Sequence, residues 1–246
     1  MSQTAYQALK ARVEATATRV GRAGQVRLVA VSKAQPDEKL VDALQDGCRL
    51  FGENYVQELE GKLSRLPTHP QAGPLMAEVE WHFIGHLQTN KVRNILPHVR
   101  LIHSVDRESL IDALEKRAAS LQLVQPILLE INLGGEESKS GCRFEQLPAL
   151  VEQVLRNPHL ELKGLMTLPP PEDDAERVRP YFRQLRQLRD DLQQRYAHPL
   201  PELSMGMSAD FEVAIEEGAT LVRVGTALFG TRSPRPASPS VSQEKA

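Results

Sequence analysis

Short apolar runs recur along this chain and alternate with segments whose apolar residues have helical spacing. Eight runs follow the first helical segment, over residues 26–31, 48–51, 81–84, 101–103, 126–131, 160–165, 202–204 and 221–224. Several are apolar at consecutive positions, which is typical of parallel strands covered on both faces. Eight strands alternating with helices over about 200 residues predict an α/β fold, a single-domain (β/α)8 TIM barrel.

The segments between the runs carry the start and stop signals of helices. Pro36 fits a helix start and Gly47 fits the stop of the same helix. Asp106 and Ser208 are candidate N-caps for the helices that follow them, and the longest helix is expected from about Asp173. These segments would form the outer ring of the barrel.

An open doubly wound sheet is the alternative fold. It more often shows a phosphate-binding GxGxxG motif after its first strand, and "VSKAQP" (31–36) is not one. The N-terminal segment has apolar residues at helical spacing, from Tyr6 to Val20, and predicts an extra N-terminal helix. We therefore expect residues 1–232 to form the barrel and the Ser/Pro-rich tail, residues 233–246, to be disordered.

Composition narrows the classes of function. Thirty basic against 32 acidic residues leave a formal charge of −2, so neither a nucleic-acid partner nor a membrane surface is expected. No apolar stretch approaches the ~18 residues of a transmembrane helix, and the N-terminus lacks the apolar core of a secretory signal. The two cysteines are too few for a disulfide framework, so we expect a cytoplasmic protein with Cys48 in the core and Cys142 in a polar loop without a role.

The ends of the predicted strands carry the residues suited to chemistry. Lys33 follows the first run, and active sites of such barrels gather where the strands end. After the last two runs, "SMGMSADFE" (204–212) and "RVGTALFG" (223–230) supply glycines, hydroxyls and a helix start, which suit a phosphate dianion. A phosphate site across the barrel mouth from a lysine suggests pyridoxal phosphate, whose aldehyde condenses with an amine.

Arg223 and two histidines leave alternatives open. Arg223 lies inside the eighth run, where it either faces the pyridine nitrogen of the cofactor or pairs with a barrel carboxylate such as Glu53 or Glu130. His82 and His86 are four residues apart but have no obvious carboxylate partner. We therefore expect no metal site, and interpret one histidine as packing and the other as lining the cofactor.

Two polar stretches carry no clear chemistry. The run "GGEESKSG", residues 134–141, is interpreted as a solvated loop that could also close over the site, since its glycines allow hinging. The arginine-rich helix over residues 177–195 is interpreted as a solvated face.

Several motifs together resemble the pyridoxal phosphate homeostasis proteins (YggS/PROSC type). They are "VAVSK", "FGENYVQE", "WHFIGHLQTNK", "SVDR", "GLMT" and "LSMGMSADFEVAIEEGATLVRVGTALFG", and the resemblance runs from about residue 5 to 232. It implies a barrel like the N-terminal domain of alanine racemase, with pyridoxal 5'-phosphate held as an internal aldimine on Lys33. It also implies that Arg223 lies near the pyridine nitrogen. The other cofactor-binding residues that it implies are Asn54, His86, Ser204, Gly206, Met207, Ser208, Gly225 and Thr226.

Three functions are compatible with these observations. The resemblance favours a protein of intracellular vitamin B6 homeostasis without strong catalysis and without catalytic residues, whose partners are pyridoxal phosphate and apo enzymes that receive it. An amino-acid racemase or other fold-type III enzyme would need an acid/base group opposite Lys33. In alanine racemase a second domain carries that tyrosine; this chain ends soon after the eighth run, so we expect no such domain, and we expect Tyr55 in the following helix. The third possible function is a barrel that binds another phosphorylated ligand. We also expect the protein to be a monomer.

Overall fold

The fold is described from a computed structural model, which places residues 3–135 and 140–230. The predicted tail, residues 233–246, lies outside these ranges, as do residues 136–139 of the predicted loop 134–141. No helix within the two described ranges is both long and apolar enough to cross a membrane.

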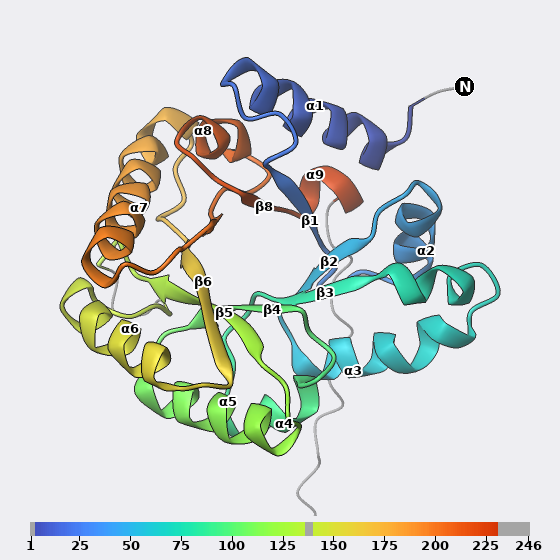
Figure 1. The fold of residues 1–246 in the computed structure, drawn as a ribbon. Coiled ribbons are helices and arrows are strands. Elements are labelled where there is room, and N and C mark those ends of the chain that lie inside the picture. Colours follow the sequence, from blue (N-terminus) through green and yellow to red (C-terminus); the bar gives the residue numbers. More distant parts are fainter. Residues whose placement is uncertain (1–2, 136–139, 231–246) are drawn as a thin grey trace, which may run out of the picture.

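Eight parallel strands close into a barrel in which every strand pairs with its neighbours in sequence (Figure 1). The strands are β1 (Arg27–Val31), β2 (Leu50–Glu53), β3 (Glu80–Phe83), β4 (Leu101–Val105), β5 (Gln125–Ile131), β6 (Leu160–Thr167), β7 (Glu202–Ser204) and β8 (Leu221–Val224). The barrel closes where β1 pairs with β8, with Arg27 opposite Leu221 and Ala30 opposite Val224. The predicted (β/α)8 barrel is confirmed, and the open sheet is excluded.

Helices surround the barrel, as Figure 1 shows. The α-helices are α1 (Ala5–Arg19), α2 (Asp37–Gln45), α3 (Val56–Arg65), α4 (Val92–Ile95), α5 (Glu108–Ser120), α6 (Leu147–Arg156), α7 (Ala175–Tyr196), α8 (Phe211–Glu216) and α9 (Thr226–Phe229). The short 3-10 helices are η1 (Leu66–Thr68), η2 (Gly73–Glu78), η3 (Thr89–Lys91) and η4 (Phe144–Gln146). The extra N-terminal helix is confirmed as α1, which begins with a capping box between Thr4 and Gln7 and packs against α8 and α9.

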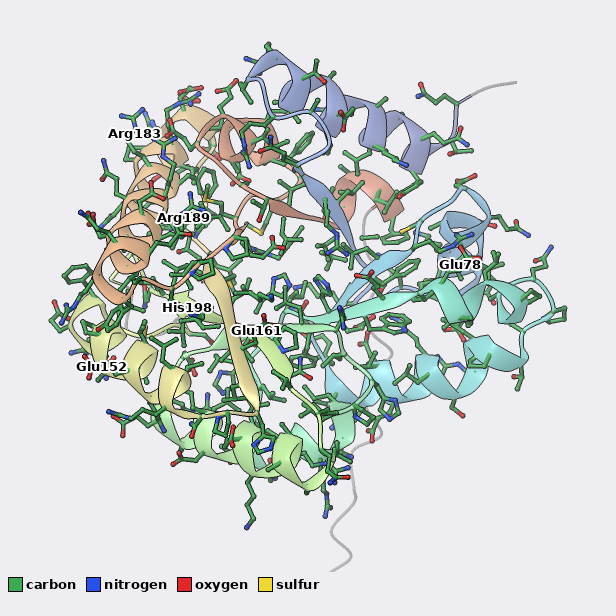
Figure 2. All side chains as sticks on the ribbon, viewed as in Figure 1. Glu78, Glu152, Glu161, Arg183, Arg189 and His198 are labelled. Atoms are coloured by element: carbon green, nitrogen blue, oxygen red, sulfur yellow. The ribbon has the colours of Figure 1, made fainter. Side chains whose placement is uncertain are left out.

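The apolar core has two parts. A small cluster fills the barrel interior, with residues that come from six different strands and contact one another: Val29, Leu50, Leu101, Leu128, Met166 and Leu221. A larger shell packs the outer faces of the strands against the helices. Charged side chains such as Glu78 and Glu152 lie on the outside of the molecule (Figure 2).

Both predicted N-caps are wrong. The N-cap of α5 is Arg107, because the carboxylate of Asp106 instead accepts a hydrogen bond from the Gly141 amide at 3.3 Å. The N-cap of α8 is Asp210, because the Ser208 hydroxyl instead accepts from the Ala227 amide at 3.2 Å. Each side chain therefore joins its loop to another part of the chain rather than starting the next helix.

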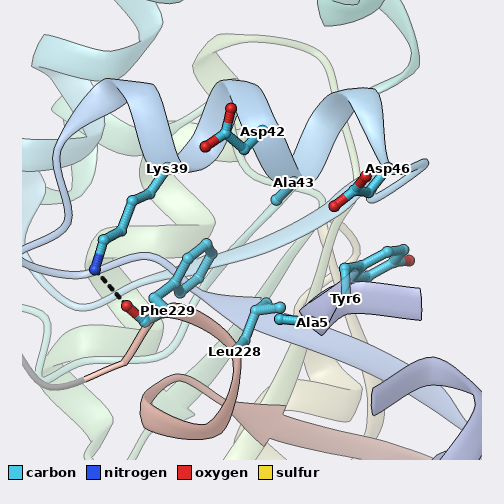
Figure 3. Close-up of a pocket in the computed structure, with 8 residues that line it drawn as sticks. All are labelled: Ala5, Tyr6, Lys39, Asp42, Ala43, Asp46, Leu228 and Phe229. Atoms are coloured by element: carbon cyan, nitrogen blue, oxygen red, sulfur yellow. Dashed lines mark hydrogen bonds between the residues drawn. The ribbon is translucent and has the colours of Figure 1, made fainter. Parts of the chain in front are cut away.

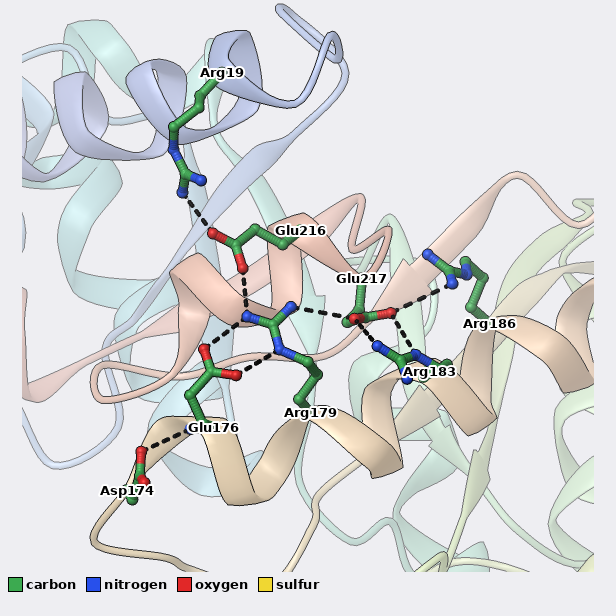
Figure 4. Close-up of polar contacts among 8 residues, drawn as sticks. All are labelled: Arg19, Asp174, Glu176, Arg179, Arg183, Arg186, Glu216 and Glu217. Carbon is green, nitrogen blue, oxygen red and sulfur yellow. Dashed lines mark hydrogen bonds and ion pairs between the residues drawn. The ribbon is translucent and has the colours of Figure 1, made fainter.

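Arg177, Arg183 and Arg195 of α7 are exposed, as expected for the predicted solvated face, but three arginines of the helix also form ion pairs. Arg179, Arg183 and Arg186 all reach Glu217, at 3.1, 3.0 and 3.3 Å, and Arg179 also pairs with Glu216 (Figure 4). The Glu217 side chain is only 6% exposed. These ion pairs fasten α7 to the carboxyl end of α8.

Cys142 does not lie in an exposed polar loop. Its amide donates to the Glu130 carbonyl at 2.8 Å and its carbonyl accepts from the Asn132 amide at 3.0 Å, so it extends the end of β5. It is buried, as is Cys48, whose predicted core position is confirmed. Burial raises the pKa of both thiols to about 12, which makes them unreactive at neutral pH.

Candidate functional site

A cavity of about 250 Å³ lies at the carboxyl ends of the strands. Its lining comes from the ends of β1, β2, β3, β6, β7 and β8: Val31, Lys33, Asn54, Ile84, Leu168, Met207, Ser208, Ala209, Arg223, Gly225 and Thr226. Among the predicted site residues, the cavity therefore brings together Lys33, Asn54, Met207, Ser208, Arg223, Gly225 and Thr226. This is the face on which barrels of this class place their chemistry.

The predicted residues Ser204, Gly206 and His86 do not line this cavity. Ser204 is buried in the barrel interior. The side chain of His86 is 52% exposed and lies 4.0 Å from Asp106 and 3.5 Å from the hydroxyl of Ser140. Whether His86 or Ser204 contacts a ligand stays a prediction, and the structure gives both a different set of partners.

Gly206 shapes the loop between β7 and α8. Its φ of +92° lies in the region that favours glycine, and a Cβ there would come within 2.6 Å of the Ala214 Cβ. Its carbonyl accepts the Arg223 amide at 2.9 Å. Gly206 therefore holds the loop against β8 and places Met207 and Ser208 at the cavity.

The loops after β7 and β8 meet at this end of the barrel. The hydroxyl of Ser208 accepts from the amide of Ala227 in the first turn of α9, which begins after Gly225. A Cβ on Gly225 would lie 3.3 Å from the carbonyl oxygen of Val31, next to the strand that leads to Lys33. Main-chain groups and hydroxyls of two loops thus line the same cavity as Lys33.

Arg223 begins a chain of buried hydrogen bonds through the barrel. Its guanidinium donates to the Ser204 hydroxyl at 2.5 Å and to the Thr167 carbonyl at 2.9 Å. The Ser204 oxygen lies 2.8 Å from His103 Nδ1, and His103 Nε2 lies 2.9 Å from His82 Nδ1. The guanidinium can only donate, so the Ser204 oxygen accepts from Arg223 and shares a further hydrogen bond with His103. Arg223, Ser204, His103 and His82 therefore form one buried polar network.

Burial keeps the two histidines neutral but does not remove the charge of the arginine. It lowers the pKa of His82 to about 3 and holds the pKa of His103 well below its usual value, where His82 and Arg223 lower it further. Burial also lowers the pKa of Arg223 to about 10, so the guanidinium stays charged at neutral pH. The cavity thus has a fixed positive charge in its wall and neutral groups behind it.

Arg223 makes neither of the two ion pairs considered from the sequence, as far as the described residues show. Glu53 pairs with Lys62 of α3 instead. Glu130 is buried without an ion pair among the described residues. Its burial, and to a lesser extent the nearby negative charge of Asp106, raises its pKa to about 7. The hydrogen-bond partners of the guanidinium are therefore neutral oxygens, while Glu130 and Asp210 attract its charge without an ion pair.

A second hollow, of about 220 Å³, lies outside the barrel between α1, α2 and α9 (Figure 3). Lys39 in its wall donates to the carbonyl of Phe229, and Asp42 and Asp46 stand beside it. The two carboxylates disfavour a phosphate, and no strand end reaches this hollow. The cavity at the strand ends is the better candidate.

Sequence reasoning missed the polar groups that support the site from behind. They include Lys62, which is buried in α3, and its partners Glu53 and Ser32. The sequence did carry a signal, because Lys62 follows the buried residues Val56 and Leu59 at the same helical spacing. A lysine on the apolar stripe of a helix needs a buried partner.

The comparisons with known proteins agree with this architecture. The family described as "Alanine racemase, N-terminal domain" matches residues 5–233. A pyridoxal phosphate homeostasis protein of Aquifex aeolicus is 48% identical over 222 residues, which cover 90% of this chain and 94% of the relative. One from Vibrio cholerae is 43% identical over 226 residues, covering 91% and 93%.

A solved structure extends the comparison. PipY of Synechococcus elongatus PCC7942, determined with PLP bound, is 35% identical and superposes with a TM-score of 0.76, covering 89% of this chain and all of that one. Identity and coverage of this size extend over the whole barrel rather than over a single motif. The chain therefore belongs to the alanine racemase N-terminal domain family and, within it, to the pyridoxal phosphate homeostasis proteins.

Proposed function

We propose that this protein binds pyridoxal 5'-phosphate in the cavity at the strand ends, covalently through Lys33, and serves intracellular vitamin B6 homeostasis without strong catalysis. The observation that carries the proposal is the placement of Lys33, Arg223 and the two glycine-containing loops around one cavity. The names of the relatives and the PLP-bound state of PipY support the same ligand.

The residues at the cavity fit this cofactor. Lys33 offers a primary amine at the cavity, two residues beyond the end of the buried strand β1. Ser208, Gly225 and Thr226 offer hydroxyls and main-chain groups for a phosphate in the same cavity. When bound, pyridoxal phosphate supplies an aldehyde for the amine and a ring that can withdraw electrons.

Arg223 suits a role at the ring nitrogen of the cofactor. A guanidinium donates and cannot accept, so it would keep that nitrogen unprotonated and weaken the ring as an electron sink. The bonds from Arg223 to Ser204 and Thr167 fix the guanidinium in place. An arginine at this position supports storage of the cofactor more than strong catalysis.

The lining also offers little acid/base chemistry. Among the described residues that line the cavity, Lys33 and Arg223 are the ionisable side chains, and a guanidinium does not release its proton in a protein. Racemisation needs such a group on each face of the bound substrate. Tyr55 is the N-cap of α3 and is exposed, and it does not line the cavity.

The test is the visible spectrum of the purified protein with added pyridoxal phosphate, followed by borohydride reduction and peptide mass mapping. We expect a visible band and a reduced adduct on Lys33, both lost in Lys33→Ala and retained in Lys10→Ala, a change of an exposed lysine. No band and no added mass at Lys33 would overturn the proposal in favour of another phosphorylated ligand. Sustained turnover of amino acids by the loaded protein would instead favour a racemase or related enzyme.

The proposal extends to partners and setting. Apo enzymes that need pyridoxal phosphate are the expected recipients, and their reactivation by the loaded protein, compared with free cofactor at equal concentration, tests this. We place the monomeric protein in the cytoplasm, since neither Cys48 nor Cys142 forms a disulfide. Gel filtration of the loaded and apo forms tests the monomer.

A further inference from the structure

A buried lysine lies directly behind the residue that precedes Lys33. Lys62 of α3 is 2% exposed, and its Nζ donates to the carbonyl of Ser32 at 2.7 Å and to the carboxylate of Glu53. The hydroxyl of Ser32 donates to the same Glu53 oxygen at 2.6 Å. Ser32 is therefore held through both its main chain and its side chain.

The residue after Lys33 is held from the same helix. The amide of Ala34 donates to Glu58 Oε2 at 2.7 Å, and that oxygen lies 3.9 Å from Lys62 Nζ. Ala34 has a φ of +55°, in the left-handed region that costs an L-residue about 1 kcal/mol. Such a conformation persists when neighbouring contacts over-determine it, as the bond from Glu58 does here.

Stability does not explain why this network is built from charges. Burying an ion pair costs desolvation that the attraction between the two charges often fails to exceed. Lys62 and Glu53 are both buried, and the second Glu53 oxygen has no hydrogen-bond partner among the described residues. What the charges do supply is directional bonds to the residues on either side of Lys33.

We propose that Lys62, Glu53 and Glu58 are positioning residues, which hold the turn Ser32–Ala34 so that the amine of Lys33 faces the cavity. The inference rests on the proposed attachment of the cofactor to Lys33. A reactive group works best when contacts behind it lock its backbone and rotamer. The three residues come from β2 and α3, so the lysine of one strand is set by the next βα unit.

The first test uses Glu58→Ala, which removes the acceptor for Ala34 from a partly exposed position. We expect faster hydrogen exchange of the Ala34 amide in the apo protein. Attachment of pyridoxal phosphate to Lys33 should slow about tenfold, a loss that misplacement of a reactive group readily causes. Glu58→Gln keeps an acceptor, so the exchange rate of the Ala34 amide and the rate of attachment should both return close to the wild-type values. Glu60→Ala changes an exposed residue of the same helix and should leave both rates unchanged. If the Glu58→Ala protein showed the wild-type exchange rate at the Ala34 amide and the wild-type rate of attachment at Lys33, the inference would be overturned.

The second test removes the buried pair as a unit. Lys62→Met combined with Glu53→Gln leaves no unpaired buried charge, so its fold is expected to survive, as circular dichroism would show. We expect slower attachment at Lys33 here too, and an unchanged rate in a folded double variant would contradict the proposal. If the wild-type protein took up no pyridoxal phosphate, the proposed function would fail, while exchange at Ala34 would still decide whether Glu58 holds the turn.

Discussion

The guanidinium of Arg223 lies 2.5 Å from the hydroxyl of Ser204, its neighbour on β7, and both side chains are buried in the barrel. This bond makes Ser204 part of the support of Arg223, and contact of Ser204 with the phosphate, which the family resemblance implies, stays a prediction. Ser204 is also hydrogen-bonded to His103, which in turn is hydrogen-bonded to His82.

The role of the two hydrogen bonds from Arg223 to Ser204 and Thr167 is tested by Arg223→Lys. Lysine keeps the charge but has a single nitrogen, which cannot reproduce the planar fork to Ser204 and Thr167. We expect a loss of about 1–3 kcal/mol in the free energy of unfolding, because a buried acceptor is left unsatisfied. The visible band of the loaded protein should also shift. Urea denaturation and absorbance measure the two effects, and Arg177→Lys, on an exposed site, is the control.

Glu130 predicts a pH dependence of stability. Its pKa in the folded protein is raised to about 7 from an ordinary value of 4.5, so between these values the folded carboxyl keeps a proton that the unfolded chain loses. The contribution of Glu130 to stability therefore falls as the pH rises through this window. Glu130→Gln should gain up to about 3 kcal/mol relative to wild type between pH 4.5 and pH 7.

Urea unfolding at several pH values checks this expectation. Glu145→Gln, a change of an exposed glutamate in η4, is the control for the loss of one negative charge. A difference between Glu130→Gln and wild type that stays constant with pH would contradict the raised pKa.

Glu217 predicts a dependence of the opposite sign. Burial raises the pKa of Glu217, but hydrogen bonds from Arg183 and Arg179 lower it by more, so the pKa in the folded protein lies below its ordinary value. Its stabilising effect is therefore present above the pKa of the unfolded chain and is lost as the pH falls through the lower folded pKa. Glu217→Gln should cost roughly 1.5–3 kcal/mol at pH 7, as expected for hydrogen bonds to a charged group, and less in acid.

The matched control for Glu217 is Glu176→Gln, which changes an exposed partner of Arg179 in the same cluster. We expect it to cost less than Glu217→Gln in thermal unfolding, because solvent screens exposed pairs. Equal losses in the two variants would mean that burial of Glu217 adds nothing.

Gly206→Ala tests the loop that presents Ser208. The change adds both left-handed strain and a Cβ 2.6 Å from Ala214. Gly24→Ala is the matched control, since Gly24 also has a positive φ, of +72°, but a Cβ added there would meet nothing within 4 Å. We expect both to lower the thermal midpoint and only Gly206→Ala to weaken retention of pyridoxal phosphate on dialysis. Equal retention in the two variants would argue against the loop as a ligand contact.

Much of this molecule could be predicted from the chain alone. The strands β7 and β8 lie where the apolar runs predicted them, and Lys33 follows β1 as expected. Hydrophobic periodicity is a local property, and parallel strands in a barrel bring their carboxyl ends to one face. Those two facts suffice to put Lys33 and the loops after β7 and β8 around one cavity.

Other features depended on which side chains meet across the closed barrel. No local pattern indicated that Ser204 would bond to Arg223, that Lys62 would reach Ser32 and Glu53, or that Cys142 would continue the edge of β5. Buried polar groups must find partners, but many pairings satisfy a given set of donors and acceptors. Only the register of the strands and the direction of each side chain select one of them, and both are set when the barrel closes.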